Sequence, residues 1–199
     1  MQNNLFIAIT GGIGSGKSKV LRYIQSLNYK VIDLDEVYAK LLDDTQFLSG
    51  ICDITGVPPI LRNDGSLELN RREVSEKVFN EPETLRLLNE YTHPKIIQEA
   101  KSEALAAGGT VFCEVPLLYE SHLENLFDYV IVIMRSESER IRAVEKRSGL
   151  TAAEIEKRIK NQFDYANLTL NEHTIVIEND GDVSELYAKV EFEIKKIIG

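Results

Sequence analysis

The sequence contains 199 residues, of which 43% are hydrophobic and 28% are charged, and this composition excludes a disordered chain. The net charge of −9 argues against a general nucleic-acid binder, because such proteins carry a basic surface that neutralises phosphates. No apolar run approaches the roughly 20 residues that a membrane span needs, and the first residues lack the basic segment of an export signal. We therefore expect a cytoplasmic globular protein.

Five short runs rich in valine and isoleucine predict buried strands. They lie at residues 5–9, 30–33, 110–115, 129–134 and 173–178. Helical patterns of apolar residues occupy the intervals, at residues 16–27, 36–43, 81–107, 136–147, 151–165 and 183–198. Because strands and helices alternate, we predict an α/β fold in which a five-stranded parallel sheet is flanked by helices on both sides.

The connection between the second and third predicted strands is unusually long, since most connections in compact domains are only a few residues long. Residues 38–108 are therefore predicted to form an inserted, mostly helical lobe, and residues 1–37 and 109–199 to form the core. The lobe contains a turn-rich stretch at residues 55–66. It also contains a long helical pattern that we expect to be interrupted at residues 93–94, because proline disfavours helical backbone at the residue before it.

A glycine-rich loop follows the first predicted strand. Residues 11–18 read GGIGSGKS, which matches the phosphate-loop pattern G-x-x-x-x-G-K-[S/T], and an amphipathic helix follows. Glycines allow several backbone N–H groups to converge on one phosphate, and the helix N-terminus adds positive charge. Lys17 is predicted to neutralise the β- and γ-phosphates, and Ser18 to bind Mg²⁺ through its hydroxyl. The loop therefore predicts a nucleoside triphosphate site, and the alternative is a glycine-rich turn without a ligand.

Acidic residues follow two further strands, at the edge where open α/β sheets bind ligands. Asp33 and Asp35 follow the second strand, where they can bind Mg²⁺ or take a proton from an attacking hydroxyl. Alternatively, Asp35 caps the next helix. Glu114 ends the third strand, where it is predicted to reach the metal through water, and Glu120 follows on the same loop. The alternative for both glutamates is an ordinary surface position.

Positive charge is concentrated in two segments of this acidic chain. Residues 1–33 contain four basic residues and one acidic residue, and residues 135–160 contain eight basic and five acidic residues. The segments indicate either a local anion site or two solvated helix faces. A GTPase is not indicated, because NQFD at residues 161–164 has Gln162 in place of the lysine of the guanine-binding pattern and lies in a predicted helix.

Six segments together resemble a known family in their order and spacing. They are TGGIGSGKS, VIDLDE, DGSLELNRREVSEKVF, HPKI, VPLLYE and IEND, and they span nearly the whole chain. In these segments the sequence resembles the dephospho-CoA kinase family. The resemblance implies transfer of a phosphoryl group from MgATP to the ribose 3′-hydroxyl of dephospho-CoA, the last step of coenzyme A synthesis. It also implies a phosphate-loop kinase core, a CoA-binding helical lobe and a mobile helical lid at about residues 136–167.

The resemblance also implies roles for individual residues. Catalytic roles are implied for Asp35 as the base and for Lys17 and Arg147. ATP binding is implied for Gly11, Gly12, Ile13, Gly14, Ser15, Gly16, Lys17, Ser18, Val20, Asn179 and Gly181. Acceptor binding is implied for Asp35, Asp64, Arg71, Phe79, His93, Pro116 and Leu117. Mg²⁺ is implied to be held by Ser18, Asp33 and Glu114, and the lid glutamine falls on Gln162.

The sequence departs from the family pattern at three places. Glu114 stands where the family has aspartate, and Asn70 replaces an aspartate of the lobe. The lid pattern Gln-x-x-Arg reads Arg140 to Ala143, so its arginine is missing or shifted to Arg142. These departures bear on the metal shell and on the lid contacts more than on the reaction.

ATP and dephospho-CoA are thus the expected partners, with Mg²⁺ as the cofactor and without nucleic acid, membrane or an obligate protein partner. Two alternatives remain, which are another nucleoside or nucleotide kinase with the same core, and a nucleotide-dependent switch that binds a protein. The acidic pair of Asp33 and Asp35 and the substrate-sized lobe favour the kinase. A switch would bind ATP without any stimulation by an acceptor.

Overall fold

Two compact units make up the part of the chain that the computed structural model describes, residues 4–199. The first unit contains the residues up to Ile32 and those from Ala104 onward, and the second contains residues 33–103. The second unit is therefore an insertion in the sequence of the first, between its second and third sheet strands.

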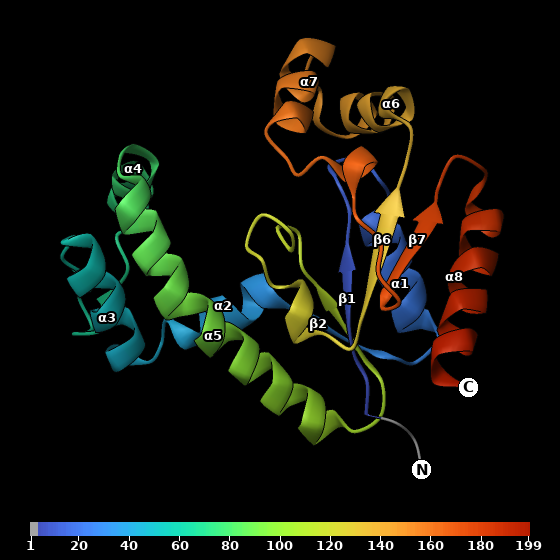
Figure 1. Ribbon diagram of the computed structural model, residues 1–199. Coiled ribbons are helices and arrows are strands. Elements are labelled where there is room, and N and C mark those ends of the chain that lie inside the picture. The colour runs from blue at the N-terminus through green and yellow to red at the C-terminus, as the bar shows by residue number, and fades with distance from the viewer. Residues whose placement is uncertain (1–3) are drawn as a thin grey trace. The chain divides into compact units, whose positions relative to one another are not determined.

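The first unit is built on a five-stranded parallel sheet (Figure 1). Its strands are β1 (Phe6–Thr10), β2 (Lys30–Asp33), β5 (Val111–Glu114), β6 (Tyr129–Met134) and β7 (Thr174–Glu178), in the order β2-β5-β1-β6-β7. β1 pairs in parallel with β5 and β6, so that Ile9 lies level with Glu114 on one side and with Ile131 on the other. Every residue of β1 is buried, as expected for a central strand covered on both faces. The predicted α/β class and its five strands are confirmed.

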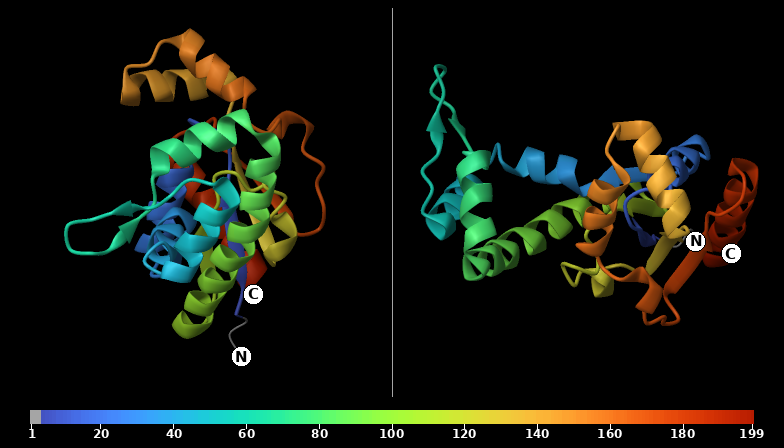
Figure 2. Two further views of the ribbon diagram at one scale, coloured as in Figure 1. Left: turned by 90° about the vertical axis from the view of Figure 1, so that its left-hand side faces the viewer. Right: turned by 90° about the horizontal axis from the view of Figure 1, so that it is seen from above.

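Helices of the first unit cover the sheet and extend beyond the ends of its strands. They are α1 (Lys17–Ser26), α6 (Glu137–Ser148), α7 (Ala152–Lys160) and α8 (Val183–Ile198). Ile24 of α1 and Val190 of α8 belong to the hydrophobic core of the sheet, and Tyr23 stacks on Tyr187 with ring centroids 4.1 Å apart. α6 and α7 lie side by side beyond the carboxyl end of β6 (Figures 1 and 2). They therefore stand at the sheet edge where α/β proteins bind ligands.

The second unit is mostly helical. It contains α2 (Leu34–Leu41), α3 (Thr45–Thr55), α4 (Arg71–Asn80), most of α5 (Pro82–Ala107) and an antiparallel hairpin of β3 (Ile60–Leu61) and β4 (Leu67–Glu68). Phe47 and Ile51 of α3 pack with Leu69 and Val74 in its core. The sequence patterns predict neither α3 nor the hairpin. α3 is rich in residues that favour helices weakly, so it depends on this packing and on the carboxylate of Asp44, which accepts hydrogen bonds from two backbone N–H groups of its first turn.

α5 continues through Pro94, so the predicted interruption of this helix at residues 93–94 is wrong. A proline in a helix interior has no N–H to donate, so one backbone hydrogen bond is lost, and its ring clashes with the carbonyl group of the preceding turn. Thr92, Ile97 and Ala100 are buried on either side of it, so tertiary packing outweighs the local preference. At 26 residues α5 has the length to cross a bilayer, yet neither it nor any other described helix combines that length with the necessary apolar composition.

Candidate active site

The loop between β1 and α1 ends in a helix N-terminus that no side chain caps. Gly16 occupies the cap position with a φ of 100°, in the left-handed region that favours glycine. By contrast, side chains cap α2, α3, α4, α7 and α8. Backbone N–H groups at an uncapped helix N-terminus attract anions, so this loop suits the phosphate ligand that its sequence predicts. Val20 lies one turn further along α1 and is fully buried in the core, and its contact with ATP stays a prediction.

Lys17 begins α1, and its ammonium group folds back over the loop. Nζ donates a 3.0 Å hydrogen bond to the carbonyl of Gly11. Burial lowers the pKa of Lys17, the carboxylates of Glu114 and Glu120 oppose this shift, and two arginines of α6 add to it. The loop therefore contains a partly buried cation whose hydrogen-bond acceptor is the loop itself.

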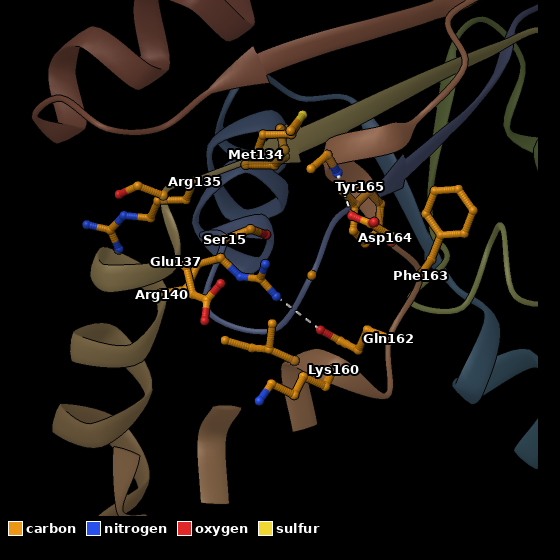
Figure 3. A pocket seen from close by; sticks show the side chains of 15 residues that line it. Ser15, Met134, Arg135, Glu137, Arg140, Lys160, Gln162, Phe163, Asp164 and Tyr165 are labelled. Carbon is orange, nitrogen blue, oxygen red and sulfur yellow. Dashed lines mark hydrogen bonds between the residues drawn. The ribbon is translucent and has the colours of Figure 1, made fainter. Parts of the chain in front are cut away.

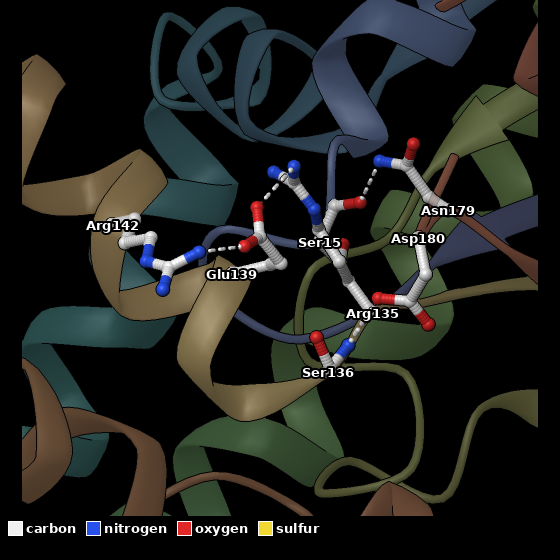
Figure 4. A network of polar contacts seen from close by, with 7 residues as sticks. All are labelled: Ser15, Arg135, Ser136, Glu139, Arg142, Asn179 and Asp180. Atoms are coloured by element: carbon white, nitrogen blue, oxygen red, sulfur yellow. Dashed lines mark hydrogen bonds and ion pairs between the residues drawn. The ribbon is translucent and has the colours of Figure 1, made fainter. Parts of the chain in front are cut away.

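The turn after β7 is hydrogen-bonded to the loop (Figure 4). Asn179 is buried, and its Nδ2 donates a 2.6 Å hydrogen bond to the carbonyl of Ser15. The carboxylate of Asp180 accepts a 2.9 Å hydrogen bond from the N–H of Ser136, which precedes α6. Gly181 follows and is exposed. The structure therefore shows Asn179 as a residue that holds the loop, and ATP contacts of Asn179 and Gly181 stay predictions.

Arg140 and Gln162 both contact the backbone of Ile13 in the loop (Figure 3). The Nε of Arg140 donates a 2.9 Å hydrogen bond to the carbonyl of Ile13, and its Nη2 donates at 3.2 Å to Oε1 of Gln162. That oxygen also accepts a 2.8 Å hydrogen bond from the N–H of Ile13. Beside these contacts lies a cavity of about 500 Å³, whose further lining residues include Met134, Arg135, Phe163 and Tyr165. Sequence patterns do not indicate the Arg140 contact, because residue 140 reads only as a departure from the lid pattern.

The chain leaves α7 at Lys160, so the helix predicted over residues 151–165 is too long. The N–H of Phe163 donates a 2.9 Å hydrogen bond to Oε1 of Glu120, and the hydroxyls of Tyr165 and Thr10 lie 3.2 Å apart. These contacts with the loop after β5 and with the end of β1 outweigh the helical pattern of the sequence. They also give Glu120 a structural partner.

The other two arginines of α6 differ from Arg140 in their contacts. Arg147 is exposed, and no hydrogen bond found within residues 4–199 joins its side chain to the loop, so its catalytic role stays a prediction. Arg142 is exposed and pairs with Glu139, which also pairs with Arg135 at 3.2 Å (Figure 4). The arginine of α6 that contacts the loop is therefore Arg140.

Oxygen donors suited to Mg²⁺ lie at the loop and at the end of β5. Ser18 is exposed in the first turn of α1, and Glu114 lies level with Ile9 at the carboxyl end of the sheet. Mg²⁺ prefers such hydroxyl and carboxylate oxygens and commonly takes its remaining ligands from substrate phosphates and water. Ser18 and Glu114 therefore carry the kinds of oxygen that Mg²⁺ binds, and a metal ion held by them together with a nucleotide stays a prediction.

Asp33 and Asp35 differ in their surroundings at the start of α2. Asp33 is the cap residue, and its Oδ1 accepts a 2.8 Å hydrogen bond from the N–H of Asp35. The alternative in which Asp35 caps this helix is therefore wrong, because an extended backbone places the side chain of Asp33 at that position. Asp35 is exposed on the first turn, which keeps its carboxylate accessible.

Two residues of the second unit combine an accessible side chain with chemistry suited to the acceptor. Arg71 begins α4, lines a cavity of about 420 Å³ and forms no ion pair among the residues that the structure describes. Phe79, on the same helix, is 88% exposed. Asn70 caps α4 by accepting a hydrogen bond from the N–H of Glu73 at 3.3 Å. Asparagine caps a helix as well as aspartate does, so this departure from the family pattern keeps the local structure.

The other predicted acceptor residues are less accessible, are engaged in local hydrogen bonds or lie in the first unit. The carboxylate of Asp64 accepts hydrogen bonds from the N–H and the hydroxyl of Ser66, at 2.9 and 2.6 Å, and so shapes the β3–β4 turn. Burial lowers the pKa of His93, which favours its neutral imidazole. Pro116 and Leu117 belong to the first unit, where they follow β5 with Leu117 more than half exposed. Their contacts with an acceptor stay predictions.

Sequence comparison decides the family. The model of the dephospho-CoA kinase family matches residues 5–185. The chain belongs to the dephospho-CoA kinase family. The dephospho-CoA kinase of Corynebacterium glutamicum is 33% identical over 198 residues, which cover 97% of this chain and 100% of that protein. That of Staphylococcus aureus strain bovine RF122 is 34% identical over 195 residues, which cover 96% of this chain and 92% of that protein.

A solved structure agrees with this assignment. The dephospho-CoA kinase from Campylobacter jejuni superposes with a TM-score of 0.66 at 26% identity, covering 97% of this chain and 96% of that one. As a member of the dephospho-CoA kinase family, the chain is a kinase that phosphorylates dephospho-CoA with ATP in coenzyme A biosynthesis. The family resemblance of the sequence segments is thus confirmed. Both alternatives, a different nucleoside kinase and a protein-binding switch, lose their support.

Proposed function

We propose that the chain transfers the γ-phosphoryl group of MgATP to the ribose 3′-hydroxyl of dephospho-CoA in the cytoplasm, with ATP on residues 11–18. The observation that carries this proposal is the uncapped N-terminus of α1, where Gly16 leaves the backbone open and Lys17 places its ammonium group over the loop. An anion of high charge offsets the cost of keeping such a cation partly buried. The phosphates of a nucleoside triphosphate can accept hydrogen bonds from the open backbone and can neutralise the charge of Lys17.

The second unit supplies the proposed acceptor-binding residues. Arg71 offers a guanidinium without an ion-pair partner in the described chain, and this group suits the pyrophosphate of dephospho-CoA. Phe79 exposes nearly its whole ring, which suits stacking against a base or an apolar chain. An arginine is well hydrated at the surface, whereas a largely exposed phenylalanine ring leaves apolar surface in water that a bound ligand could cover. The exposed ring, on the same helix as a guanidinium without an ion pair in the described chain, supports the assignment of both side chains to the acceptor.

The remaining residues have separate roles in phosphoryl transfer. Asp35 accepts or orients the proton of the attacking hydroxyl, and Lys17 neutralises charge on the β- and γ-phosphates. Ser18, Asp33 and Glu114 would hold Mg²⁺, which supplies further neutralisation of the phosphates when bound. The segment of α6 and α7 acts as a lid that excludes water, which would otherwise accept the phosphoryl group.

A coupled assay of ADP release over a panel of acceptors tests the proposal. Dephospho-CoA is expected to stimulate ADP release strongly, while AMP and nucleosides are expected to give little, and NMR of the product should place the new phosphate on the 3′-oxygen. The Lys17→Ala variant, purified in the same way, controls for a contaminating kinase. Equal stimulation by AMP, or phosphate at another hydroxyl, would contradict the proposed acceptor.

A further inference from the structure

The glycine loop is shaped to receive the guanidinium of Arg140 as well as a phosphate (Figure 3). A Cβ atom built on Gly12 would lie 2.8 Å from Cζ of Arg140, and one built on Gly14 would lie 2.6 Å from the carbonyl oxygen of Arg140. Real Cβ atoms do not approach other heavy atoms so closely, because van der Waals repulsion rises steeply at such distances. The absence of side chains at Gly12 and Gly14 therefore lets α6 contact the loop directly.

The charge of Arg140 is poorly compensated by the protein. Arg135 and Arg142 both pair with Glu139, whereas Arg140 forms no ion pair among residues 4–199. Its guanidinium is half-buried, and burial lowers its pKa, an effect that the charge of Glu137 opposes. A cation withdrawn from water without a carboxylate partner favours a bound anion.

Hydrogen bonds fix one edge of the guanidinium and leave donors for a ligand. Of the five N–H groups that an arginine carries, one on Nε bonds to the carbonyl of Ile13 and one on Nη2 bonds to Gln162. The side chain also lines the cavity of about 500 Å³ beside the loop. The guanidinium is thus held in one orientation by the loop peptide, with its other N–H groups available to an anion on the loop.

We infer that Arg140 contacts the transferring phosphoryl group, while its bonds to Ile13 and Gln162 keep the guanidinium oriented. This inference rests on the proposed function and adds a second lid arginine to Arg147. A planar cation that is positioned before the reaction stabilises the charge that spreads over the phosphoryl oxygens during transfer, without reorganising at that moment. Lysine at position 140 could not keep the bond to Ile13 and also reach several oxygens, because it carries a single nitrogen.

Nucleotide binding tests the inference without depending on the acceptor. Fluorescent mant-ADP is titrated into the full chain with Mg²⁺, with and without aluminium fluoride, which mimics the transferring phosphoryl group. Arg140→Ala and Arg140→Lys are expected to weaken binding of the ADP–aluminium fluoride complex by roughly 10²-fold, and that of ADP alone hardly at all. The control is Arg158→Ala, which removes an exposed arginine of the neighbouring α7 and should change neither affinity.

A double-mutant cycle separates this role from a structural one. Gly12→Ala places a methyl group against the flexible end of Arg140 and within 3.2 Å of Oε1 of Gln162, so it should weaken the aluminium fluoride complex clearly in the wild-type background and much less in Arg140→Ala. Equal losses for ADP with and without fluoride, or additive losses in the cycle, would overturn the inference. If the fluoride complex depends on Arg140 but dephospho-CoA stimulates no ADP release, the inference stands and the proposed acceptor fails.

Discussion

The side-chain amide of Asn179 donates a 2.6 Å hydrogen bond to the backbone carbonyl of Ser15, and so joins the last strand of the sheet to the phosphate loop. A Cβ atom on Gly16 would collide with the same amide, so the glycine makes room for Asn179 as well as for the left-handed backbone. The shape of the loop is thus maintained by a residue far away in the sequence. A loop held in this way keeps its N–H groups oriented before a nucleotide arrives.

Replacement of Asn179 by alanine is expected to destabilise the protein and to weaken ATP binding. The carbonyl of Ser15 would lose its partner in a buried place, which costs about 1–3 kcal/mol of the free energy of unfolding. Urea unfolding measures this loss, and the KM for ATP should rise. Asn80→Ala is a matched control, because Asn80 donates a 2.8 Å bond to the carbonyl of Glu76 at an exposed position. Equal losses in the two variants would show that the bond to Ser15 has no special importance.

Replacement of Lys17 by methionine is expected to stabilise the ligand-free protein while reducing turnover by orders of magnitude. The folded protein lowers the pKa of Lys17 below the ordinary lysine value of 10.5, chiefly through burial, so the charged form destabilises the fold. That penalty is fully present below the folded pKa and is lost as the pH rises from the folded pKa to 10.5.

Urea unfolding of both proteins from pH 7 to pH 10 measures this difference. The advantage of Lys17→Met should shrink as the pH rises, because the unfolded wild-type chain holds more protons than the folded one in that range. Lys19→Met controls for the removal of a lysine at an exposed position of the same helix. A stability difference that grows with pH would contradict the burial of the Lys17 charge.

Phe79→Ala is expected to raise the KM for dephospho-CoA and to leave both the KM for ATP and the free energy of unfolding nearly unchanged. The ring is 88% exposed, so its removal creates no cavity. Phe192→Ala is the control, since Phe192 is 66% exposed on α8 and has no assigned ligand. If the variant loses stability but keeps its acceptor KM, Phe79 has a structural role instead.

The sheet and the loop could be predicted because their signals are local. β1 and β6 are runs of apolar residues buried on both faces, and the glycine pattern of residues 11–18 has a mechanism that depends on adjacent positions. α3 has weaker signals, since its helix depends on a cap and on packing against other helices. Local pattern therefore identifies elements whose sequence signal is local, even where, as in β1, the pairing partners lie far away in the sequence.

The contacts of the site with α6 and α7 could not be predicted in the same way. Arg140 and Ile13 are 127 residues apart, and an arginine in a charged helix looks the same whether it faces solvent or the loop. The residues after Lys160 carry a helical pattern, yet the bond from Phe163 to Glu120 sets a different backbone. Such contacts depend on tertiary structure. The family pattern does not indicate them at position 140, because this chain has arginine where the pattern has glutamine.

The two aspartates at the start of α2 can be assigned by separating charge from helix capping. Asp33→Asn keeps a good cap and removes the charge, whereas Asp33→Ala removes both and should cost about 1 kcal/mol of the free energy of unfolding. If Asp33 binds Mg²⁺, both variants should lose activity, and excess Mg²⁺ should partly restore it. A loss of activity that excess Mg²⁺ restores in neither variant would contradict metal binding, and full activity in Asp33→Asn would limit Asp33 to its cap.

Asp35→Asn tests the proposed base in the same assay. Asp35 is exposed and does not cap α2, so its replacement should leave the free energy of unfolding nearly unchanged. The loss of a general base lowers kcat by roughly 10²- to 10⁴-fold, and added Mg²⁺ should not restore it. The KM values for ATP and dephospho-CoA should change little, because Lys17 and the second unit's Arg71 are untouched. In a loose transition state the nucleophile is little deprotonated, so a carboxylate that only orients the hydroxyl would give a smaller loss with a flat pH profile of kcat. A kcat near that of the wild type at saturating substrates would show that Asp35 takes no part in the mechanism. Because Asp35 does not cap α2, a loss of kcat could not be attributed to a lost helix cap.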